Sequence, residues 1–586
     1  MNLYDYVSSQ IKTAIAGVPE LAAADLSNVA VEVPKSREFG DFSTNAAMVL
    51  TKQVGRSPRA IADLILPAIA ALSFADSVSV AGPGFVNVKL KDEFIRNCVI
   101  PGPGLDNTCV NEVPDNSSKR NFRDDKMVID LDYGAYNVAK AMHIGHLRGS
   151  IVGDTFYRIA KFLGHRPISY NHMGDWGKPM ALVIAWIMRN FPNDWNKPDF
   201  KINEFEFNSY YPTASAFAKE NPEFLAQVLQ IKKEFQDGHS EYFALYEKMM
   251  EISLADMDAV VRRLNILPFD NNLGERNAAK YLEPVEKILR DKNLLENSDC
   301  AVIINVRRDT DTAPMPPMMF YDSRGADTYD STDIATLYYR KITDNPDKII
   351  YMSDARQNLH FEQLFRVAEL ADLFPRDDLE SMGYGTINGP GGKPFKTRDG
   401  GAATLAGIID MVDTAARARV AESGKNLPDE TVKMIALAAL KFNDLMHDVK
   451  SDYIFDPDLV TQFEGRTGPY ILYTAVRLNA VLKRAQSTEH RAQINELATE
   501  ERELLLCVLD FQRTVESAFE KRATDLLANY TYDLCQTANS FYHNCPILKP
   551  DIDDDTRAHR LEILKRALST LATAIDLMGL KVPDEM

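Results

Sequence analysis

The stretch NVAKAMHIGHLRGS, residues 137–150, places one lysine and two histidines within seven residues, Lys140, His143 and His146. The apolar run MVIDLD precedes it and a helical pattern follows, so these side chains lie where a strand turns into a helix. In an open parallel sheet, ligands bind beyond the carboxyl ends of the strands, where helix N-termini present free N–H groups to phosphate. Gly145 leaves room for a ligand beside the backbone, and the histidines can donate hydrogen bonds to phosphoryl oxygens. The stretch therefore predicts a site for a phosphate-bearing ligand.

Two other interpretations of the histidine pair remain open at this point. Histidines three residues apart could line one helix face as metal ligands, or could simply be polar residues at a helix cap. No carboxylate or cysteine nearby completes a ligand set, and the six cysteines never form a Cys-x-x-Cys pair. We therefore expect no metal site and no protein-bound zinc. Other nucleotide signatures are missing too, since GPGGKPFKT lacks the glycine spacing and the ending of a P-loop and no Gly-x-Gly-x-x-Gly opens a helix.

The elements around this stretch follow the order of a parallel sheet. MVIDLD and PISYNHM are predicted strands, and a helix from 147 to 163 lies between them. One buried stripe on that helix is indicated by apolar residues spaced four, three and four apart, Val152, Phe156, Ile159 and Leu163. A second strand and helix are predicted in KIIYMSDARQNLHFEQLFRVAEL, so the sheet extends from at least 127 to 370. The charged segment at about 195–264 has a helical pattern without strand signals and is predicted to be an insertion.

Composition predicts three domains, because 586 residues exceed what a single core usually holds. Residues 1–112 begin with helical periodicity and end on SVSVAGPGFVNVKL, which predicts two strands and a turn in a small α+β domain. A linker rich in Gly, Pro, Asn and Asp leads into the sheet domain, residues 113–430. From 431 to 586 the periodic segments are helical, which predicts an all-α domain.

The formal net charge of -18 argues against nucleic-acid binding by overall attraction, because such binding depends on neutralisation of phosphates by Lys and Arg. Any nucleic-acid contact must be local.

No run of about 18 apolar residues occurs, and the start MNLYDYVSSQIKTAIAGVPE lacks the basic-then-apolar order of a secretory signal. We therefore expect a cytoplasmic protein with no membrane partner.

His143-Ile144-Gly145-His146 resembles the signature of class I aminoacyl-tRNA synthetases, and the sequence around it resembles arginyl-tRNA synthetases of the bacterial type. The resemblance covers nearly the whole chain, in the blocks SREFGDFSTNAA, AGPGFVN, NVAKAMHIGHLRGSIVGD, NHMGDWGK, DARQNLHFEQLF, GKPFKTRDGG, FEGRTGPYILY and NSFYHNCPIL. It implies a Rossmann-like parallel-sheet catalytic domain with a helical insertion, an N-terminal tRNA-binding domain and a helical anticodon-binding domain. It also implies ATP-dependent ligation of L-arginine to tRNA(Arg) through an arginyl-adenylate, with release of AMP and diphosphate.

The resemblance assigns roles in the first step, in which the arginine carboxylate attacks the α-phosphorus of ATP. Fixed positive donors would stabilise the charge that builds on the phosphoryl oxygens. The implied catalytic residues are Lys140, His143 and His146. The implied ATP-binding residues are Asn137, Lys140, His143, Gly145, His146 and Lys396. Mg2+ would accompany ATP, held largely by its phosphates.

Carboxylates suit the planar guanidinium of arginine, because they pair with it through two hydrogen bonds. The family pattern implies that the arginine site contains Asp132, Asn137, Tyr329, Asp333 and Gln357. The usual Ser-Ser-Pro between the first two is here Gly134-Ala135-Tyr136. From the residues alone, Asp333 could instead be the N-cap of a helix beginning near IATLYYR, Tyr329 a core residue and Gln357 a solvated one.

A second class I signature, usually Lys-Met-Ser-Lys-Ser, is replaced by Pro394-Phe395-Lys396-Thr397-Arg398 between glycines. The glycines suit a mobile lid. Because Thr397 stands where the usual second lysine would, we expect Lys140 to supply the main positive charge and Lys396 to be secondary.

The C-terminal helices carry TAVR where the family usually has Asp-Ala-Leu-Arg. The tRNA-binding candidates there are Tyr470, Tyr473, Arg477, Phe541 and Tyr542, whose rings could stack on unpaired anticodon bases. Ordinary helix packing is the alternative for each aromatic residue. By resemblance the N-terminal domain contacts the corner of the tRNA, and the protein is expected to be a monomer.

Two rival functions fit the sequence less well. Another class I synthetase would have no use for the acidic pair Asp132 and Asp333 with an uncharged amino acid. A catalytically inactive tRNA-binding or regulatory relative would be expected to lose the histidines or the acidic pair, and the sequence retains both.

Overall fold

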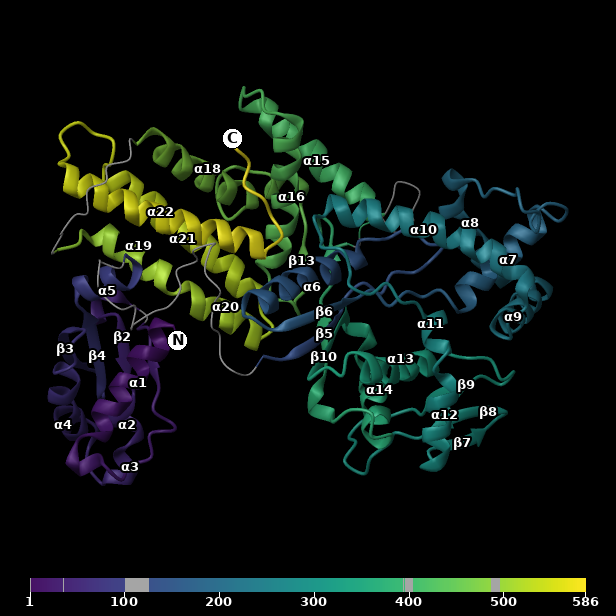
Figure 1. Cartoon of the computed structure of the whole chain (residues 1–586), viewed down its shortest axis with the longest axis horizontal. Coiled ribbons are helices and arrows are strands. Elements are labelled where there is room, and N and C mark those ends of the chain that lie inside the picture. Colours follow the sequence, from purple (N-terminus) through teal and green to yellow (C-terminus); the bar gives the residue numbers. More distant parts are fainter. Residues whose placement is uncertain (1, 35, 101–125, 394, 396–403, 486–495) are drawn as a thin grey trace.

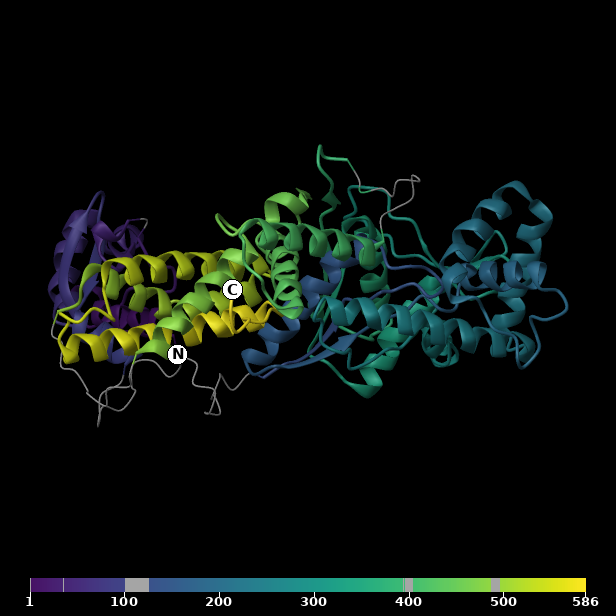
Figure 2. The same cartoon turned by 90° about the horizontal axis from the view of Figure 1, so that it is seen from above.

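The computed structural model describes residues 2–34, 36–100, 126–393, 395, 404–485 and 496–586. Three parts follow one another along the long axis (Figure 1, Figure 2): a small mixed unit, a bundle of long helices, and a parallel sheet with a helical insertion at the far end. Within the described ranges, every helix is too short or too polar to cross a membrane.

The N-terminal unit is an antiparallel sheet of strand order β1-β2-β4-β3 covered by helices. The predicted hairpin is present, and Gly82 and Gly84 in its turn have φ of 54° and 137°, a region that favours glycine. The bounds are α1 (Leu3–Ala16), β1 (Val31–Glu32), β2 (Phe42–Thr44), α2 (Ala46–Val49), α3 (Thr51–Val54), α4 (Pro58–Ala70), β3 (Ala75–Ala81), β4 (Phe85–Leu90) and α5 (Asp92–Val99).

The central sheet has the order β11-β10-β5-β6, and each neighbouring pair is parallel. Its strands and crossover helices are β5 (Val128–Asp132), α6 (Gly145–Phe162), β6 (Arg166–Tyr170), β10 (Lys348–Asp354), α14 (Asn358–Leu370) and β11 (Leu379–Tyr384). From β5 the chain crosses to β6 on one side, whereas β10 and β11 extend the sheet on the other. The carboxyl ends of β5 and β10 therefore flank the point where the strand order reverses, which is where such sheets bind ligands.

The predicted stripe of α6, Val152, Phe156, Ile159 and Leu163, is buried, and the helix is buried on other sides as well. One side packs on β6 and β10, and the other is covered by helices of the C-terminal bundle. Gly153 allows α6 to pack directly against the ring of Tyr133. A Cβ at this position would lie 2.1 Å from a ring carbon of Tyr133, so glycine is required. The sequence pattern showed only the apolar side because the bundle contacts small and charged residues of α6.

Between β6 and β10 the chain forms the insertion and a small antiparallel sheet that the sequence did not predict, of order β7-β8-β9. The bounds are α7 (Lys178–Asn190), α8 (Glu204–Glu220), α9 (Pro222–Gln236), α10 (Phe243–Arg263), α11 (Glu275–Ala279), α12 (Leu282–Asp291), β7 (Leu295–Ser298), β8 (Ala301–Ile304), β9 (Met318–Tyr321) and α13 (Tyr329–Thr343). Helix α13 packs beside α14 and brings its N-terminus toward the carboxyl edge of the central sheet.

The C-terminal part is a bundle of long helices with one short parallel strand pair, β12 with β13. The bounds are β12 (Ile387–Asn388), α15 (Leu405–Glu422), α16 (Asp429–Leu445), β13 (Tyr453–Ile454), α17 (Pro457–Val460), α18 (Gly468–Arg484), α19 (Thr499–Leu509), α20 (Phe511–Glu520), α21 (Thr524–Asn544) and α22 (Asp554–Leu577). Arg502 of α19 joins the bundle to the N-terminal unit, donating to Asp41 at 2.6 and 2.8 Å and to Asp92 at 2.9 Å.

Two buried ion pairs connect α6 to α16. Arg148 Nε lies 3.1 Å from Asp444 Oδ1, and both side chains are almost fully enclosed. The ammonium of Lys441 lies 3.6 Å from Asp154 Oδ2 and donates to the carbonyl of Leu264 at 3.1 Å. Burial lowers the pKa of Lys441 to about 8, which the charge of Asp154 partly offsets. The helix that carries the histidine pair is thus held to the bundle by charge as well as by apolar packing.

Replacing Asp444 by Ala should destabilise the protein strongly, because Arg148 would remain buried without a counterion. Breaking a buried pair in this way typically costs about 3–5 kcal/mol. Urea unfolding would measure the loss. The matched control is Asp258→Ala, whose partner Arg262 is 81% exposed and for which the change should stay below about 1 kcal/mol. Equal, small losses in both variants would show that the buried pair does not hold the two parts together.

Candidate active site

The two histidines lie with stacked rings at the N-terminus of α6, with centroids 4.0 Å apart and planes inclined by 22°. The backbone N–H of His143 donates to Nδ1 of His146 at 3.1 Å, and the N–H of Gly145 donates to Nδ1 of His143 at 3.1 Å. A nitrogen that accepts a hydrogen bond carries no proton, so each neutral ring has its proton on Nε2. Both Nε2–H groups are therefore available as donors to a ligand.

Both histidines are held neutral. Burial, then the charges of His143 and Lys140, lower the pKa of His146 to about 3. Burial, then the charges of Lys140 and Arg356, lower the pKa of His143. The sequence suggested three positive donors here; the structure instead has two neutral donors, and Lys140 is the cation of the group.

Lys140 is positioned by the insertion. Its ammonium lies over the ring of Tyr211 on α8, 5.6 Å from the centroid. The preceding residue, Ala139, has φ of 59°, which is uncommon for a residue with a Cβ, and its N–H donates to Ser253 Oγ of α10 at 3.0 Å. Helices α8 and α10 therefore hold the loop that presents the lysine.

The altered loop Gly134-Ala135-Tyr136 has a defined structure. Gly134 lies against Asn171, and Ala135 has φ of 47°. Tyr136 is buried, shares a hydrogen bond of 2.8 Å with Ser150, and meets the His146 ring edge-on at 5.7 Å. Tyr136, which stands where the family usually has proline, therefore packs against the ring of His146.

The chain that follows the predicted lid returns to this site at Thr404. Lys396 and Thr397 lie outside the described residues. The first described residue after them, Thr404, pairs with His143 through an isolated antiparallel bridge, and the N–H of Leu405 donates to the carbonyl of Met142 at 2.8 Å. Thr404 also caps the N-terminus of α15. The predicted lid is thus connected directly to the histidine loop at its C-terminal end.

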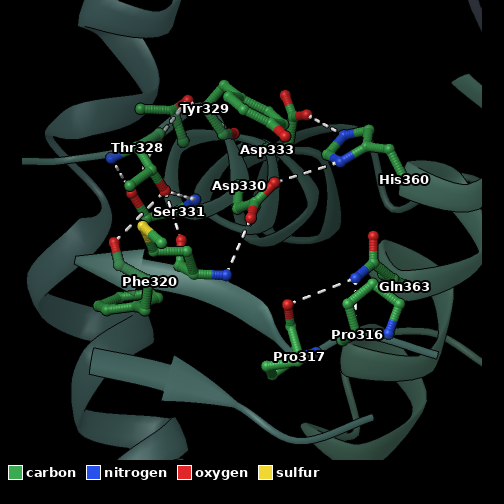
Figure 3. A network of polar contacts seen from close by, with 12 residues as sticks. Pro316, Pro317, Phe320, Thr328, Tyr329, Asp330, Ser331, Asp333, His360 and Gln363 are labelled. Atoms are coloured by element: carbon green, nitrogen blue, oxygen red, sulfur yellow. Dashed lines mark hydrogen bonds and ion pairs between the residues drawn. The ribbon is translucent and has the colours of Figure 1, made fainter. Parts of the chain in front are cut away.

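The N-terminus of α13 carries a charged cluster (Figure 3). Thr328 caps this helix, so the interpretation of Asp333 as its N-cap was wrong. Oδ1 of Asp333 lies 3.1 Å from Nε2 of His172, and Oδ2 lies 2.7 Å from Nε2 of His360. Burial alone would raise the pKa of Asp333, but the hydrogen bonds and charges of the two histidines hold it below its usual range. Asp333 is therefore an ionised carboxylate.

Asp132, the second predicted carboxylate, is buried at the end of β5 and forms an ion pair with Arg340 of α13. Arg340 is fully buried, with its guanidinium 4.1 Å from the ring centroid of Tyr170 and 5.2 Å from that of Tyr351. The charge of Asp132 is thus balanced inside the protein. The two members of the predicted acidic pair differ, since Asp333 is paired only with titratable histidines.

The remaining candidates for the arginine site lie at the same edge of the sheet. Tyr329, the first residue of α13, is 61% exposed with its ring 5.1 Å from that of His360, which excludes a core role. Gln357 is exposed where the chain leaves β10 for α14. Asn137 forms a parallel bridge with Gly174.

Three groups near Asp333 were not singled out from the sequence. His172 and His360 lie inside the blocks NHMGDWGK and DARQNLHFEQLF, but nothing in their spacing indicated a shared carboxylate. Glu275, the first residue of α11, faces the same cluster, and burial together with the charges of Asp333 and Asp175 raises its pKa to about 7. The segments that carry these groups come together only in the folded chain.

One group of described residues has a geometry that could hold a metal ion: Glu234, His239 and Glu241 on the insertion. Glu234 already accepts a hydrogen bond from Tyr242 at 2.7 Å, and the other two side chains are exposed. Exposed acidic groups of this kind are common without an ion, so no metal is assigned.

Comparison with known families decides between the alternatives. The model for the catalytic domain of class I (R) tRNA synthetases matches residues 110–457, that for the DALR anticodon binding domain matches 471–586, and that for the arginyl tRNA synthetase N terminal domain matches 5–90. The chain belongs to the arginyl-tRNA synthetase family. The known reaction of this family is the aminoacylation of tRNA(Arg), so its partners are tRNA(Arg), arginine and ATP.

Individual relatives of this arginyl-tRNA synthetase family agree over the full length. The arginine–tRNA ligase of Alkaliphilus oremlandii is 34% identical, with 98% of this chain and 99% of that protein covered. The arginine–tRNA ligase of Chromobacterium violaceum is 30% identical, with both chains fully covered. The arginyl-tRNA synthetase structures from Plasmodium falciparum and Thermus thermophilus have TM-scores of 0.80 and 0.79 at 23% and 21% identity, each covering 100% of this chain and 99% of the other, and these show the shared fold.

At the start of the segment that matches the DALR anticodon binding domain, one cavity of about 460 Å³ is lined by two tRNA-binding candidates, Tyr473 and Arg477, and by a third just before the segment, Tyr470. The guanidinium of Arg477 lies 4.8 Å from the ring centroid of Tyr473 and donates to its hydroxyl at 3.2 Å. Tyr542 is 39% exposed on α21. The assignment of Phe541 was wrong: its side chain is 0% exposed, because adjacent residues of a helix point in different directions and Phe541 is on the core side.

His146 is expected to stay uncharged well below the usual titration range of histidine, since its pKa is lowered to about 3. Because the unfolded chain would bind this proton near pH 6.5, stability should fall as the pH drops from there toward 3. NMR of the imidazole C–H signals would follow each histidine. The signals of His543, exposed at the end of α21, provide the comparison. A titration of His146 in the usual range of histidine would contradict its neutral form.

Proposed function

We propose that this chain carries out its family's reaction with ATP bound at the N-terminus of α6 and arginine bound at the N-terminus of α13. The observation that carries the proposal is the presence of these two sites at the carboxyl ends of the adjacent strands β5 and β10. One offers neutral N–H donors and a lysine, which suit phosphoryl oxygens, and the other an ionised carboxylate, which suits a guanidinium. The product of the first step is arginyl-adenylate, from which arginine passes to tRNA(Arg) with release of AMP.

At the ATP site, His143 and His146 donate through Nε2 to oxygens of the reacting phosphate, and Lys140 supplies positive charge. Gly145 lets the nucleotide approach the backbone, and Asn137 lies beside it as a further polar contact. Lys396 has a secondary role in this scheme. Asp354, whose charge reaches His143, is paired with Arg356 at 2.8 and 2.6 Å, so Mg2+ would be held mainly by the phosphates of ATP and by water.

At the arginine site, Asp333 pairs with the guanidinium through two charge-assisted hydrogen bonds. Glu275 faces the same cluster and adds a second acceptor. Asp132 acts through Arg340, whose position it fixes. Tyr329, Gln357 and Asn137 surround the rest of the amino acid. Groups that select arginine and groups that activate ATP thus come from different elements.

For tRNA, we infer local contact surfaces, because the net charge of -18 opposes binding over the whole surface. The cavity beside Tyr473 and Arg477 suits an anticodon base, through stacking and a hydrogen-bonding cation. In the N-terminal unit, a mostly apolar cavity of about 500 Å³ is flanked by the exposed rings of Phe39 and Phe85, which suits a base at the corner of the tRNA. The proposal takes the protein as a monomer of the cytoplasm that acts without a membrane or a zinc ion.

Replacing Lys140 by Ala should slow formation of the adenylate while leaving arginine affinity nearly unchanged. Removing one donor to transition-state charge commonly costs about 100- to 1000-fold in rate. Arginine-dependent exchange of pyrophosphate into ATP, measured with tRNA present, tests both the reaction and this role. Lys161→Ala, an exposed lysine near the end of α6, is the matched control. An unchanged rate for Lys140→Ala at saturating substrates would refute the role, and no arginine-dependent exchange by the parent would refute the function.

Replacing Asp333 by Asn should raise the KM for arginine far more than it lowers stability, because the guanidinium would face a neutral amide. Losing one partner of a buried charged pair costs about 2 to 5 kcal/mol of binding. The same exchange assay gives the KM, and thermal unfolding gives the stability. Asp258→Asn, on the exposed side of α10, is the control. An unchanged KM with reduced stability would mean that Asp333 has only a structural role.

A further inference from the structure

Each carboxylate oxygen of Asp333 lies close to a histidine ring. Oδ2 is hydrogen-bonded to Nε2 of His360, from α14, at 2.7 Å, and Oδ1 lies 3.1 Å from Nε2 of His172, from the loop after β6, which is an ion-pair distance. The other ring nitrogen of His360 lies 3.2 Å from Oδ1 of Asp330, one turn earlier on α13 (Figure 3). A guanidinium that binds Asp333 must therefore share this carboxylate with the two histidines.

The surroundings of His360 favour its charged form. Nε2 is hydrogen-bonded to Oδ2 of Asp333 at 2.7 Å, and Nδ1 lies within ion-pair distance of Oδ1 of Asp330 at 3.2 Å. A ring with a carboxylate on either side is stabilised as the doubly protonated imidazolium. Burial opposes this charge, but the hydrogen bonds and charges of Asp330 and Asp333 raise the pKa of His360 to about 10.

His172 is charged for a similar reason. Burial opposes its charge, but the hydrogen bond and charge of Asp333, with further contributions from Asp132 on β5 and Glu275 on α11, raise its pKa to about 9. The two carboxylates of α13 and the two histidines therefore balance. Asp132 is already paired with Arg340.

An arginine side chain entering this balanced cluster would bring one uncompensated positive charge into a largely buried site. Burying an unpaired charge is costly, and ionisable groups usually shift their protonation instead. The guanidinium itself cannot lose its proton at neutral pH. The imidazolium ions next to Asp333 can, since the positive charge of a guanidinium on the same carboxylate disfavours theirs.

We propose that His172 and His360 keep Asp333 ionised in the empty site with protons that the guanidinium replaces, so that binding of arginine releases a proton from this histidine pair. The inference rests on the proposed function of Asp333. In the exchange, the hydrogen bond from an imidazolium to Asp333 is replaced by those from the guanidinium, and the imidazole proton goes to solvent. Both histidines are positioning residues, because they act on the substrate through Asp333.

The exchange also gives a basis for selectivity. A ligand of the same shape but without charge, such as one with a urea in place of the guanidinium, has no charge to exchange for the proton. It would meet a carboxylate still paired with imidazolium. Arginine affinity should rise with pH, approaching tenfold for each pH unit where one full proton is released, because proton loss is easier at high pH.

Titration calorimetry with arginine, in buffers of different ionisation enthalpy at neutral pH, counts the protons released. The parent protein should release about one. Each single variant, His172→Gln and His360→Gln, is compared with His543→Gln, the exposed control, after thermal unfolding has shown that it is folded. The control should match the parent, and release should fall by half or more in at least one single variant. The α-amino group of arginine contributes equally in all of them.

Glu275 provides the decisive alternative, since its pKa is raised to about 7 and it could also give up a proton. Full release from Glu275→Gln supports the histidine pair as the source, whereas loss of release in that variant overturns the proposal. No release by the parent, or parental release by both histidine variants, also overturns it. Asp333→Asn separates the two levels: an unchanged arginine KM there defeats the proposed role of Asp333, whereas a raised KM with no proton release by the parent defeats only this inference.

Discussion

The charged contacts between α6 and α16 are the constraint on which the rest of the arrangement depends. On α6, the side chains of Arg148 and Asp154 point toward the bundle. Arg148 pairs with Asp444 of α16 and Asp154 pairs with Lys441 of α16, and all four side chains are buried. Taking four charges out of water is costly, so such pairs form only when the geometry of both helices is right. They therefore specify one orientation of the bundle against the sheet, and with it the direction in which the stacked histidines face.

The two carboxylates at the edge of the sheet show how one residue type acquires different roles. Asp132 is paired with an arginine of the chain, whose own charge is permanent, so this pair is structural. Asp333 is paired with two histidines, whose charge depends on their surroundings. In this site, Asp132 has a partner whose charge cannot change, whereas the histidine partners of Asp333 can lose theirs. Both carboxylates therefore have partners before arginine binds, and one of them can still accept the substrate.

Much of this architecture could be predicted from the sequence, because β5, α6, β6, β10 and α14 have apolar periodicities that depend only on local geometry. The place of the histidine loop followed from residue types at a strand-to-helix turn, and a phosphate-bearing ligand there stays a prediction. The pairing of Asp132 with Arg340 could not be predicted, since the two residues lie 208 positions apart. The prediction for Phe541 was wrong because the sequence did not show which side of its helix faces the core. The short strands β7 to β9 were missed because four residues carry too little pattern.

The support that Tyr211 and Ser253 give to the lysine loop has a consequence for how far this enzyme could be reduced in size. The helices that bear them look like an appendage at the end of the molecule (Figure 1), yet they determine the backbone of Ala139 and the placement of the ammonium beside it. Consider a shortened chain that keeps the sheet and both histidines but lacks α8 and α10. Its histidines would remain as hydrogen-bond donors, but the ammonium of Lys140 would lose the contacts that hold it in place. The insertion therefore belongs to the smallest unit that keeps Lys140 in this position.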